Sequence, residues 1–191
     1  AQQGPTEAEL LAQPCEFALI EANGEQPRLT YIEGVTPILE VDGYKFKDLN
    51  KNGELDPYED WRLTPEERTE DLLSRMSDKN KAAQMAHMTL VTLKESWFSD
   101  LDIGFALTYT YFAESKESAG EKMNYVQSLC EESELGIPVF FSMDSVIGAS
   151  WINDTTILPD AITLGATGDA ELVQELADIQ RQKMKALGVR M

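Results

Sequence analysis

The chain has 191 residues, which is enough for one sizeable hydrophobic core but short of the about 250 residues that a complete eight-stranded α/β barrel typically takes. Its 34 acidic residues against 16 Lys and Arg give a net charge of −18, and such a surface repels nucleic-acid phosphates and anionic lipid headgroups. No run of about 18 apolar residues is present. We therefore expect neither nucleic acid nor a membrane as a partner.

Residues 1–40 are polar and mixed in character, and they predict an extended arm that lies on a larger body. Asp42-Gly43 is a turn pair, and residues 44–46 alternate in polarity after it, so a β-hairpin is expected there. The strand-like segments before the turn are 16–20, 29–32 and 37–41.

Residues 48–59 match the twelve-residue calcium loop D-x-[DN]-x-[DN]-G-x5-E at every specified place. Hard oxygen ligands face one side of a tight turn, Gly53 permits the bend, and the last Glu closes the shell with both oxygens. Because Pro57 lies within the loop and a strand precedes it, we expect a lone structural Ca²⁺ loop and not a paired sensor. The alternative is a solvated turn without metal. The expected ligands are Asp48, Asn50, Asn52, Glu54 (through its backbone carbonyl), Asp56 and Glu59.

Two helices are expected after the loop. Thr64 is suited to cap the first, Pro65 suits its first helical position, and Glu67 completes a capping box. Ser77 restarts a second helix. The expected buried positions of this second helix are Ala82, Ala83, Met85 and Met88.

Strands and helices then alternate, which favours a parallel sheet. The segment 105–111 is rich in β-branched and aromatic residues and is the expected first strand. The apolar run 137–143 is typical of a buried parallel strand, Asp144 follows it, and residues 189–191 begin another strand. Helices are expected between these strands, with Ala119, Met123, Val126 and Cys130 buried on one, and Leu172, Leu176 and Ile179 turned inward on another at 170–187.

The combination of motifs resembles a known family. The segment 41–62, with VDGYKFKDLNKNG and LDPYEDWR, resembles the lead-in of exported bacterial β-glucosidase-like members of glycoside hydrolase family 3. The segment 68–85 resembles that family's first-helix motif. The segment 135–167, with LGIPV, Asp144 and LGAT, resembles its second strand and the loop after it. The resemblance covers residues 37–191.

The resemblance implies an α/β fold, namely the N-terminal part of a (β/α)8 TIM-type barrel that is incomplete in this chain. An extended arm at 1–40 and an EF-hand-like calcium segment at 41–62 would precede the barrel part at 63–191. The calcium loop would pin the arm against the barrel.

In this family the aspartate at the end of that strand binds the non-reducing sugar at the cleavage subsite, and Asp144 is the matching position. Barrel active sites also lie at the C-terminal ends of strands, where a carboxylate accepts hydrogen bonds from two sugar hydroxyls. Trp151 is a candidate for stacking on a sugar face. The alternatives are a capping or loop aspartate and a partly buried core tryptophan. Where the family usually has His-Gly, this chain has Ile147-Gly148, which leaves the sugar preference open.

The resemblance implies a retaining, exo-acting, β-glucosidase-like hydrolase with two catalytic carboxyl groups about 5–5.5 Å apart. The family carries both in later strands and neither motif occurs here, so we name no catalytic residue and expect the chain alone to be inactive. The expected partners are a β-linked gluco-oligosaccharide or glucoside and the remainder of the enzyme, as a second chain or fragment. β-Xylosides are the alternative substrates. A non-catalytic, calcium-stabilised binding or interaction module is the alternative function.

The other reactive side chains predict little chemistry. Cys15 and Cys130 lie in no Cys/His cluster, so no zinc site is expected; free thiols are the simpler expectation, and a disulfide between them stays open. His87 is the only histidine, has no evident partner, and is expected to be structural. No organic cofactor is expected. The start at Ala1 is typical of a mature exported protein, which favours a periplasmic or secreted location.

Overall fold

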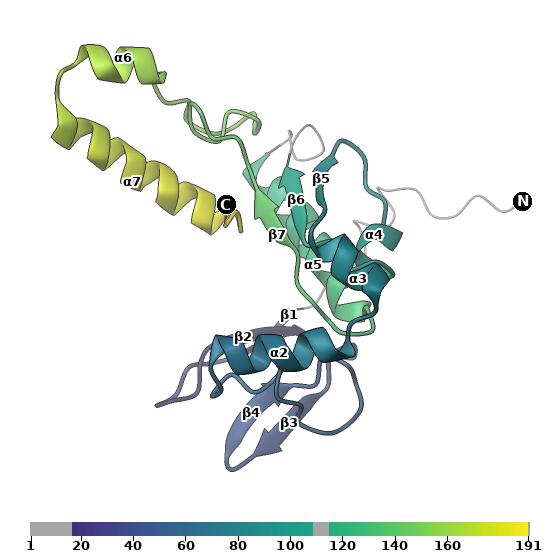
Figure 1. The fold of residues 1–191 in the computed structure, drawn as a ribbon. Helices are drawn as coiled ribbons and strands as arrows, with labels where there is room; N and C mark the ends of the chain where they lie inside the picture. Colours follow the sequence, from purple (N-terminus) through teal and green to yellow (C-terminus); the bar gives the residue numbers. More distant parts are fainter. Residues whose placement is uncertain (1–16, 109–114, 191) are drawn as a thin grey trace, which may run out of the picture. The chain divides into compact units, whose positions relative to one another are not determined.

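The computed structural model describes residues 17–108 and 115–190. Two hairpins come first, and helices and strands alternate after them (Figure 1). The elements are β1 (Phe17–Ile20), β2 (Leu29–Ile32), β3 (Ile38–Val41), β4 (Tyr44–Lys47), α2 (Pro65–Arg75), α3 (Asp78–Gln84), β5 (His87–Leu90), α4 (Ser96–Ser99), β6 (Phe105–Thr108), α5 (Lys116–Glu132), β7 (Phe140–Ser142), α6 (Ala161–Ala166) and α7 (Ala170–Ala186).

The chain divides into two compact units. The first unit is built from residues 1–86, 94–104 and 125–139, and the second from residues 87–93, 105–124 and 140–191. The C-terminal part of α5 therefore belongs to the first unit and its N-terminal part to the second. The domain boundaries expected from the sequence, at residues 40 and 62, stay predictions.

The first unit contains both hairpins, and the turn between β3 and β4 confirms the expected geometry. β1 pairs antiparallel with β2, and β3 pairs antiparallel with β4. Asp42 and Gly43 have φ angles of 55° and 80°. Two successive residues with positive φ define the turn whose twist matches a two-residue hairpin, and Asp-Gly is among the pairs that tolerate it.

A buried carboxylate holds the hairpins to the end of α5 within this unit. Glu131 is only 8% exposed, and its Oε2 accepts hydrogen bonds from the backbone N–H of Ile32 at 2.9 Å and from Thr36 Oγ1 at 2.6 Å. Its Oε1 forms an ion pair with Lys47. A buried carboxylate is tolerated because all of these donors compensate for its lost hydration.

The predicted helix starts are confirmed. Thr64 Oγ1 accepts from the N–H of Glu67 at 3.3 Å, and Glu67 Oε2 accepts from the N–H of Thr64 at 3.0 Å, which is the reciprocal capping box. Ser77 caps α3. The expectation that Ala82, Ala83, Met85 and Met88 are buried is wrong. α3 ends at Gln84 and has no buried residue, Ala82 and Met85 are exposed (Met85 to 81%), and Ala83 and Met88 are half-buried.

The second unit contains a three-stranded parallel sheet with the order β5-β6-β7 (Figure 1). Val189 makes a parallel bridge to Phe141, so the next strand begins beside β7, as expected for 189–191. The expectation that 105–111 is the first strand is wrong, because β5 precedes β6 at the edge. Within that segment, residues 109–111 lie outside the described residues.

The α5 prediction is confirmed and the α7 prediction is confirmed only in part. Ala119, Met123, Val126 and Cys130 of α5 are at most 3% exposed. α7 spans almost the predicted range, yet Leu172 and Ile179 remain 39% and 44% exposed, because within the described residues nothing covers that face. The expectation that these two side chains are buried is therefore wrong for this chain.

Cys130 is a free, buried thiol. Burial, the largest cause, raises the pKa of this thiol to about 12, so it is a packing group and not a nucleophile. Cys15 lies outside the described residues, and a disulfide between the two cysteines stays an open question. Among the residues that the structure describes, every helix is too short or too polar to cross a bilayer.

Candidate functional site

Asp144 lies just beyond the carboxyl end of β7, which is the position predicted for it. Ser142 is the last strand residue, Met143 is buried with 7% exposure, and Asp144 is exposed. Because β5, β6 and β7 are parallel, their carboxyl ends meet at one edge of the sheet, where α/β folds place their binding residues. Asp144 therefore lies at the edge of the sheet at which α/β folds place binding residues.

The backbone on either side of this aspartate is held by side chains of the same unit. Trp151 Nε1 donates to the carbonyl oxygen of Asp144 at 3.0 Å. Gln180 of α7 donates to the hydroxyl of Ser145 at 2.7 Å and also to its carbonyl oxygen. Neither Gln180 nor Ser145 carries a sequence signal for this function, since the contact joins residues 35 positions apart.

Trp151 is half-buried and lies next to the predicted sugar-binding residue. Its indole nitrogen donates to the backbone, so the residue is anchored beside Asp144. The loop that carries it is closed by the hydrogen bond from the N–H of Leu158 to the carbonyl of Ile147 at 2.9 Å. Gly148 in this loop has φ of 86°, and an added Cβ would lie 3.3 Å from the carbonyl oxygen of Thr156. Ile147-Gly148 thus forms a tight apolar turn.

His87, for which the sequence indicated no partner, has one in the structure. His87 Nε2 lies 2.6 Å from Ser142 Oγ, although the two residues are 55 positions apart. The available signal was Ser142, the one polar side chain within the apolar run 137–143. No periodicity in the sequence indicates that Ser142 contacts His87.

Three carboxylates of the predicted calcium loop are buried in the first unit. Asp48, Asp56 and Glu59 are 1%, 9% and 4% exposed. Asp48 accepts from the N–H groups of Asn52 and Gly53 at 3.1 and 2.9 Å. Acidic groups this deeply buried require compensation by donors or by a cation.

Glu59 accepts backbone hydrogen bonds within the loop, and its predicted role as a calcium ligand stays a prediction. Its Oε1 accepts from the N–H of Leu49 at 2.7 Å and of Asn50 at 3.2 Å, and its Oε2 from that of Asp56 at 3.1 Å. Burial, the largest cause, raises the pKa of Glu59, and these backbone bonds oppose the rise. Ionising the Glu59 carboxyl in the folded chain therefore costs free energy.

Asp56 is paired with a cation from α2. Arg75 donates to its two carboxylate oxygens at 2.8 and 2.9 Å, and the side-chain amides of Asn50 and Asn52 donate to Oδ2 at 2.6 and 2.8 Å. The amide nitrogens, not the oxygens, face Asp56 in this arrangement. Across the described residues, no group of three or more His, Cys, Asp or Glu side chains is arranged to hold a metal ion.

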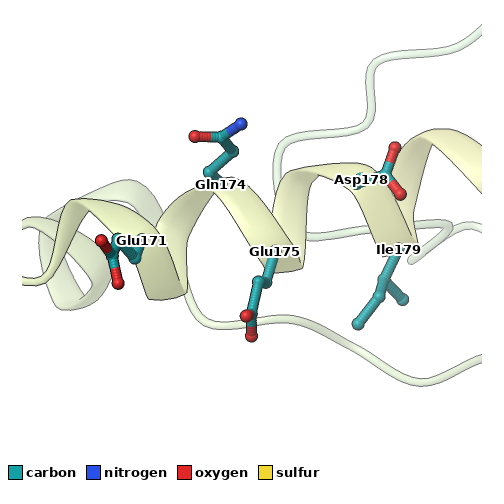
Figure 2. A pocket seen from close by; sticks show the side chains of 5 residues that line it. All are labelled: Glu171, Gln174, Glu175, Asp178 and Ile179. Atoms are coloured by element: carbon teal, nitrogen blue, oxygen red, sulfur yellow. The ribbon is translucent and has the colours of Figure 1, made fainter.

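A hollow of about 610 Å³ lies along α7 in the second unit, away from the calcium loop and from the end of β7 in the sequence. Figure 2 shows the side chains that line it projecting from successive turns of α7. Its lining consists of Glu171, Gln174, Glu175, Asp178 and Ile179. All of them come from one solvated helix face, so the hollow does not compete with the end of β7 as a binding site.

The chain matches one family model over more than half of its length. The model described as glycosyl hydrolase family 3 N terminal domain matches residues 77–191, more than half of the chain. The chain belongs to glycosyl hydrolase family 3. Within this family 3 chain the matched segment contains the β5-β6-β7 sheet, Asp144 and Trp151, whereas the loop at 48–59 precedes it.

Two curated proteins of the family are similar to this chain over most of its length. A periplasmic beta-glucosidase/beta-xylosidase from Dickeya chrysanthemi is 34% identical over 200 residues, which cover 94% of this chain and 30% of that protein. Beta-glucosidase C from Emericella nidulans is 27% identical over 162 residues, which cover 75% of this chain and 26% of that protein. The family 3 chain thus spans less than a third of either relative.

Proposed function

We propose that this chain forms the first part of a retaining, exo-acting β-glycoside hydrolase and that Asp144 binds the sugar in its cleavage subsite. The observation that carries the proposal is an exposed carboxylate at the carboxyl end of a parallel strand inside the segment that matches the family. A charged acceptor at such an edge is suited to a neutral, hydroxyl-rich ligand.

Asp144 would act by orientation. A carboxylate accepts hydrogen bonds from two neighbouring sugar hydroxyls and so fixes the ring relative to the bond that is cleaved, which lowers the entropic part of the barrier. The two reacting carboxyl groups of a retaining enzyme would be supplied by the remainder of the protein. This chain alone is therefore expected to bind weakly and to hydrolyse nothing.

The open sheet supports the need for a remainder. β5 and the strand that begins at Val189 each leave one edge without a strand partner among the described residues. Closing a barrel removes such edges. The lengths of the relatives are consistent with further barrel strands supplied by a second chain or fragment.

The substrate class is proposed to be β-linked glucosides, with β-xylosides as the alternative. The names of both relatives include β-glucosidase, and that of the Dickeya protein adds β-xylosidase and a periplasmic location. We propose the same compartment for this protein, periplasmic or secreted. A neutral sugar needs no basic patch, which agrees with the net charge of −18.

We also propose that the loop at 48–59 holds a structural Ca²⁺. Support comes from its donor set: Asp48, Asp56 and Glu59 are all buried in one loop whose motif positions supply hard oxygens. The residues that would hold the ion are these three together with Asn50, Asn52 and the carbonyl of Glu54. Asp56 already has a cationic partner in Arg75, and the ion, when bound, would supply positive charge to Asp48 and Glu59 and would fix the loop.

The proposal is tested by comparing the chain with the complete enzyme, in which the chain is joined by its remainder. Hydrolysis of 4-nitrophenyl β-D-glucoside and β-D-xyloside is measured for each. The proposal expects no activity from the chain alone and glucoside hydrolysis by the complete enzyme. Activity of the 191-residue chain alone would contradict it. A complete protein inactive on both substrates would favour the binding module.

A further inference from the structure

A histidine and a serine meet across the sheet of the second unit without being on neighbouring strands. His87 begins β5, Ser142 ends β7, and β6 lies between the two strands. Their side chains are nevertheless 2.6 Å apart at Nε2 and Oγ. The two side chains therefore lie on the same face of the sheet and meet over β6.

The imidazole ring is held in place by the first rung of the sheet. The register aligns His87, Phe105 and Phe140 across the three strands. The ring centroids of His87 and Phe105 are 5.9 Å apart, and those of Phe105 and Phe140 are also 5.9 Å apart. The row of rings supports the imidazole from one side and directs Nε2 toward the carboxyl end of β7.

The distance of 2.6 Å between His87 Nε2 and Ser142 Oγ fits a hydrogen bond in either direction, and the tautomer of His87 sets which group donates. Ser142 Oγ also lies 3.4 Å from the carbonyl oxygen of Ala106, which is a second and longer contact of the same hydroxyl. The close contact of the two side chains therefore defines the pair, and a measurement of the tautomer identifies the donor.

Ser142 is the last residue of β7 before the site. The strand is three residues long, and its ladder with β6 ends at the pair Leu107 and Ser142. The carbonyl of Ser142 accepts from Thr108 Oγ1 at 2.9 Å, and Ser142 is 4% exposed. Its hydroxyl and carbonyl bonds are thus the final restraints from the sheet on a chain that reaches Asp144 two residues later.

We propose that His87 and Ser142 form a positioning pair that sets the end of β7 and thereby the peptide of Asp144. The pair touches no substrate; it acts through the backbone that carries the proposed sugar-binding carboxylate. This inference rests on the proposed function, because the proposed role of Asp144 makes the placement of that strand end matter. It assigns to the chain's only histidine a function in the site.

The first measurement is the tautomer of His87 in the 191-residue chain by long-range ¹H–¹⁵N NMR. Because the chain has one histidine, the imidazole signals need no assignment. The proposal expects one fixed tautomer, Nε2–H if His87 donates to Ser142 and Nδ1–H if it accepts. The averaged signals of a free imidazole would overturn it without any variant.

The second measurement is hydrogen exchange at the indole N–H groups. The Trp151 indole bonds the carbonyl of Asp144 at 3.0 Å, and the Trp61 indole bonds the carbonyl of Lys45 at 3.0 Å in the other unit, which gives an internal control. His87→Phe keeps a ring but has no Nε2, and Ser142→Ala has no hydroxyl, so each variant removes the contact between the two side chains. Both should speed exchange at Trp151 about fivefold to tenfold and leave Trp61 unchanged.

Ser142→Thr keeps a hydroxyl and should restore slow exchange at Trp151. Unchanged exchange at Trp151 in folded His87→Phe and Ser142→Ala proteins would overturn the proposal. Exchange that is accelerated equally at Trp151 and Trp61, and that stays accelerated in Ser142→Thr, would also overturn it. If those two variants do not fold, the proposal is judged by the tautomer of His87 and by the indole exchange of Ser142→Thr. No step uses a sugar, so this result and the fate of the proposed function are separable.

Discussion

The indole N–H of Trp151 donates to the backbone carbonyl oxygen of Asp144 at 3.0 Å. The bond closes the segment 144–151 into a loop and fixes the indole of Trp151 to the backbone of Asp144. Trp151 thus has an anchoring role in the structure in addition to the sugar-stacking role that the sequence predicts. The two roles are separable, because phenylalanine keeps a ring but has no N–H to donate.

Substitutions of Trp151 in the complete enzyme should distinguish anchoring from stacking. Trp151→Phe removes the hydrogen bond and should raise KM for 4-nitrophenyl β-D-glucoside about threefold to tenfold. Trp151→Leu also removes the ring and should raise KM further if the ring touches sugar. A wild-type KM in Trp151→Phe would refute the anchoring role. Equal values for the Phe and Leu variants would refute stacking.

Calcium should stabilise the chain through the loop at 48–59. At a free Ca²⁺ concentration about 100 times Kd, binding adds about 2.7 kcal/mol, which raises Tm by about 5–10 °C for a chain of this size. Asp48→Asn and Glu59→Gln keep acceptor oxygens but lose charge and should abolish the shift. Glu54→Gln is the matched control, since only the backbone carbonyl of Glu54 is a predicted ligand. A Ca²⁺ response that survives in Glu59→Gln would exclude this site.

The calcium effect should also depend on pH. Burial raises the pKa of Glu59 in the folded chain, so without metal its contribution to stability is fully present below its unfolded pKa and is lost as pH rises through the folded pKa. Calcium requires the ionised carboxylate and gains affinity over the same window. The Ca²⁺-induced Tm shift measured by calorimetry should therefore be larger at pH 7 than at pH 5. An equal shift at both values would contradict the assignment of Glu59.

Two glycines should respond in opposite directions to alanine. A Cβ on Gly104 would lie 2.1 Å from the backbone carbonyl oxygen of Gln84, so Gly104→Ala must displace backbone and should cost about 3 kcal/mol or more. Gly120 in α5 has open space around an added Cβ, and Gly120→Ala should stabilise by about 0.5–1 kcal/mol. Urea unfolding followed by circular dichroism measures both. A neutral Gly104→Ala would show that α3 and Gly104 are not in this close contact.

Features that depend on local chemistry were predictable from the sequence. The capping box of Thr64 and Glu67 and the turn at Asp42-Gly43 involve residues within a few positions of one another, and both are confirmed. The buried face of α5 follows from helical periodicity alone. The position of Asp144 after an apolar strand was also predictable, because the strand and the residue are adjacent in the sequence.

Features that depend on distant partners were not predictable. β5 has four residues directly after a helix, too few for a pattern, and only its pairing with β6 makes it a strand. The contact between His87 and Ser142 and the pairing of Asp56 with Arg75 join residues that no spacing rule links. Burial of α7 was predicted from its apolar stripe, but burial needs a covering surface, and the described residues provide none for Leu172 and Ile179.

The most direct test of the account is Asp144→Asn in the complete enzyme, with Asp100→Asn as a control at an exposed aspartate of the first unit. The substitution keeps the size of the side chain and removes the charge that strengthens its hydrogen bonds to sugar hydroxyls. The account predicts that kcat/KM for 4-nitrophenyl β-D-glucoside falls at least about a hundredfold in Asp144→Asn and stays within about twofold in Asp100→Asn. A folded Asp144→Asn enzyme with wild-type kcat/KM would contradict it.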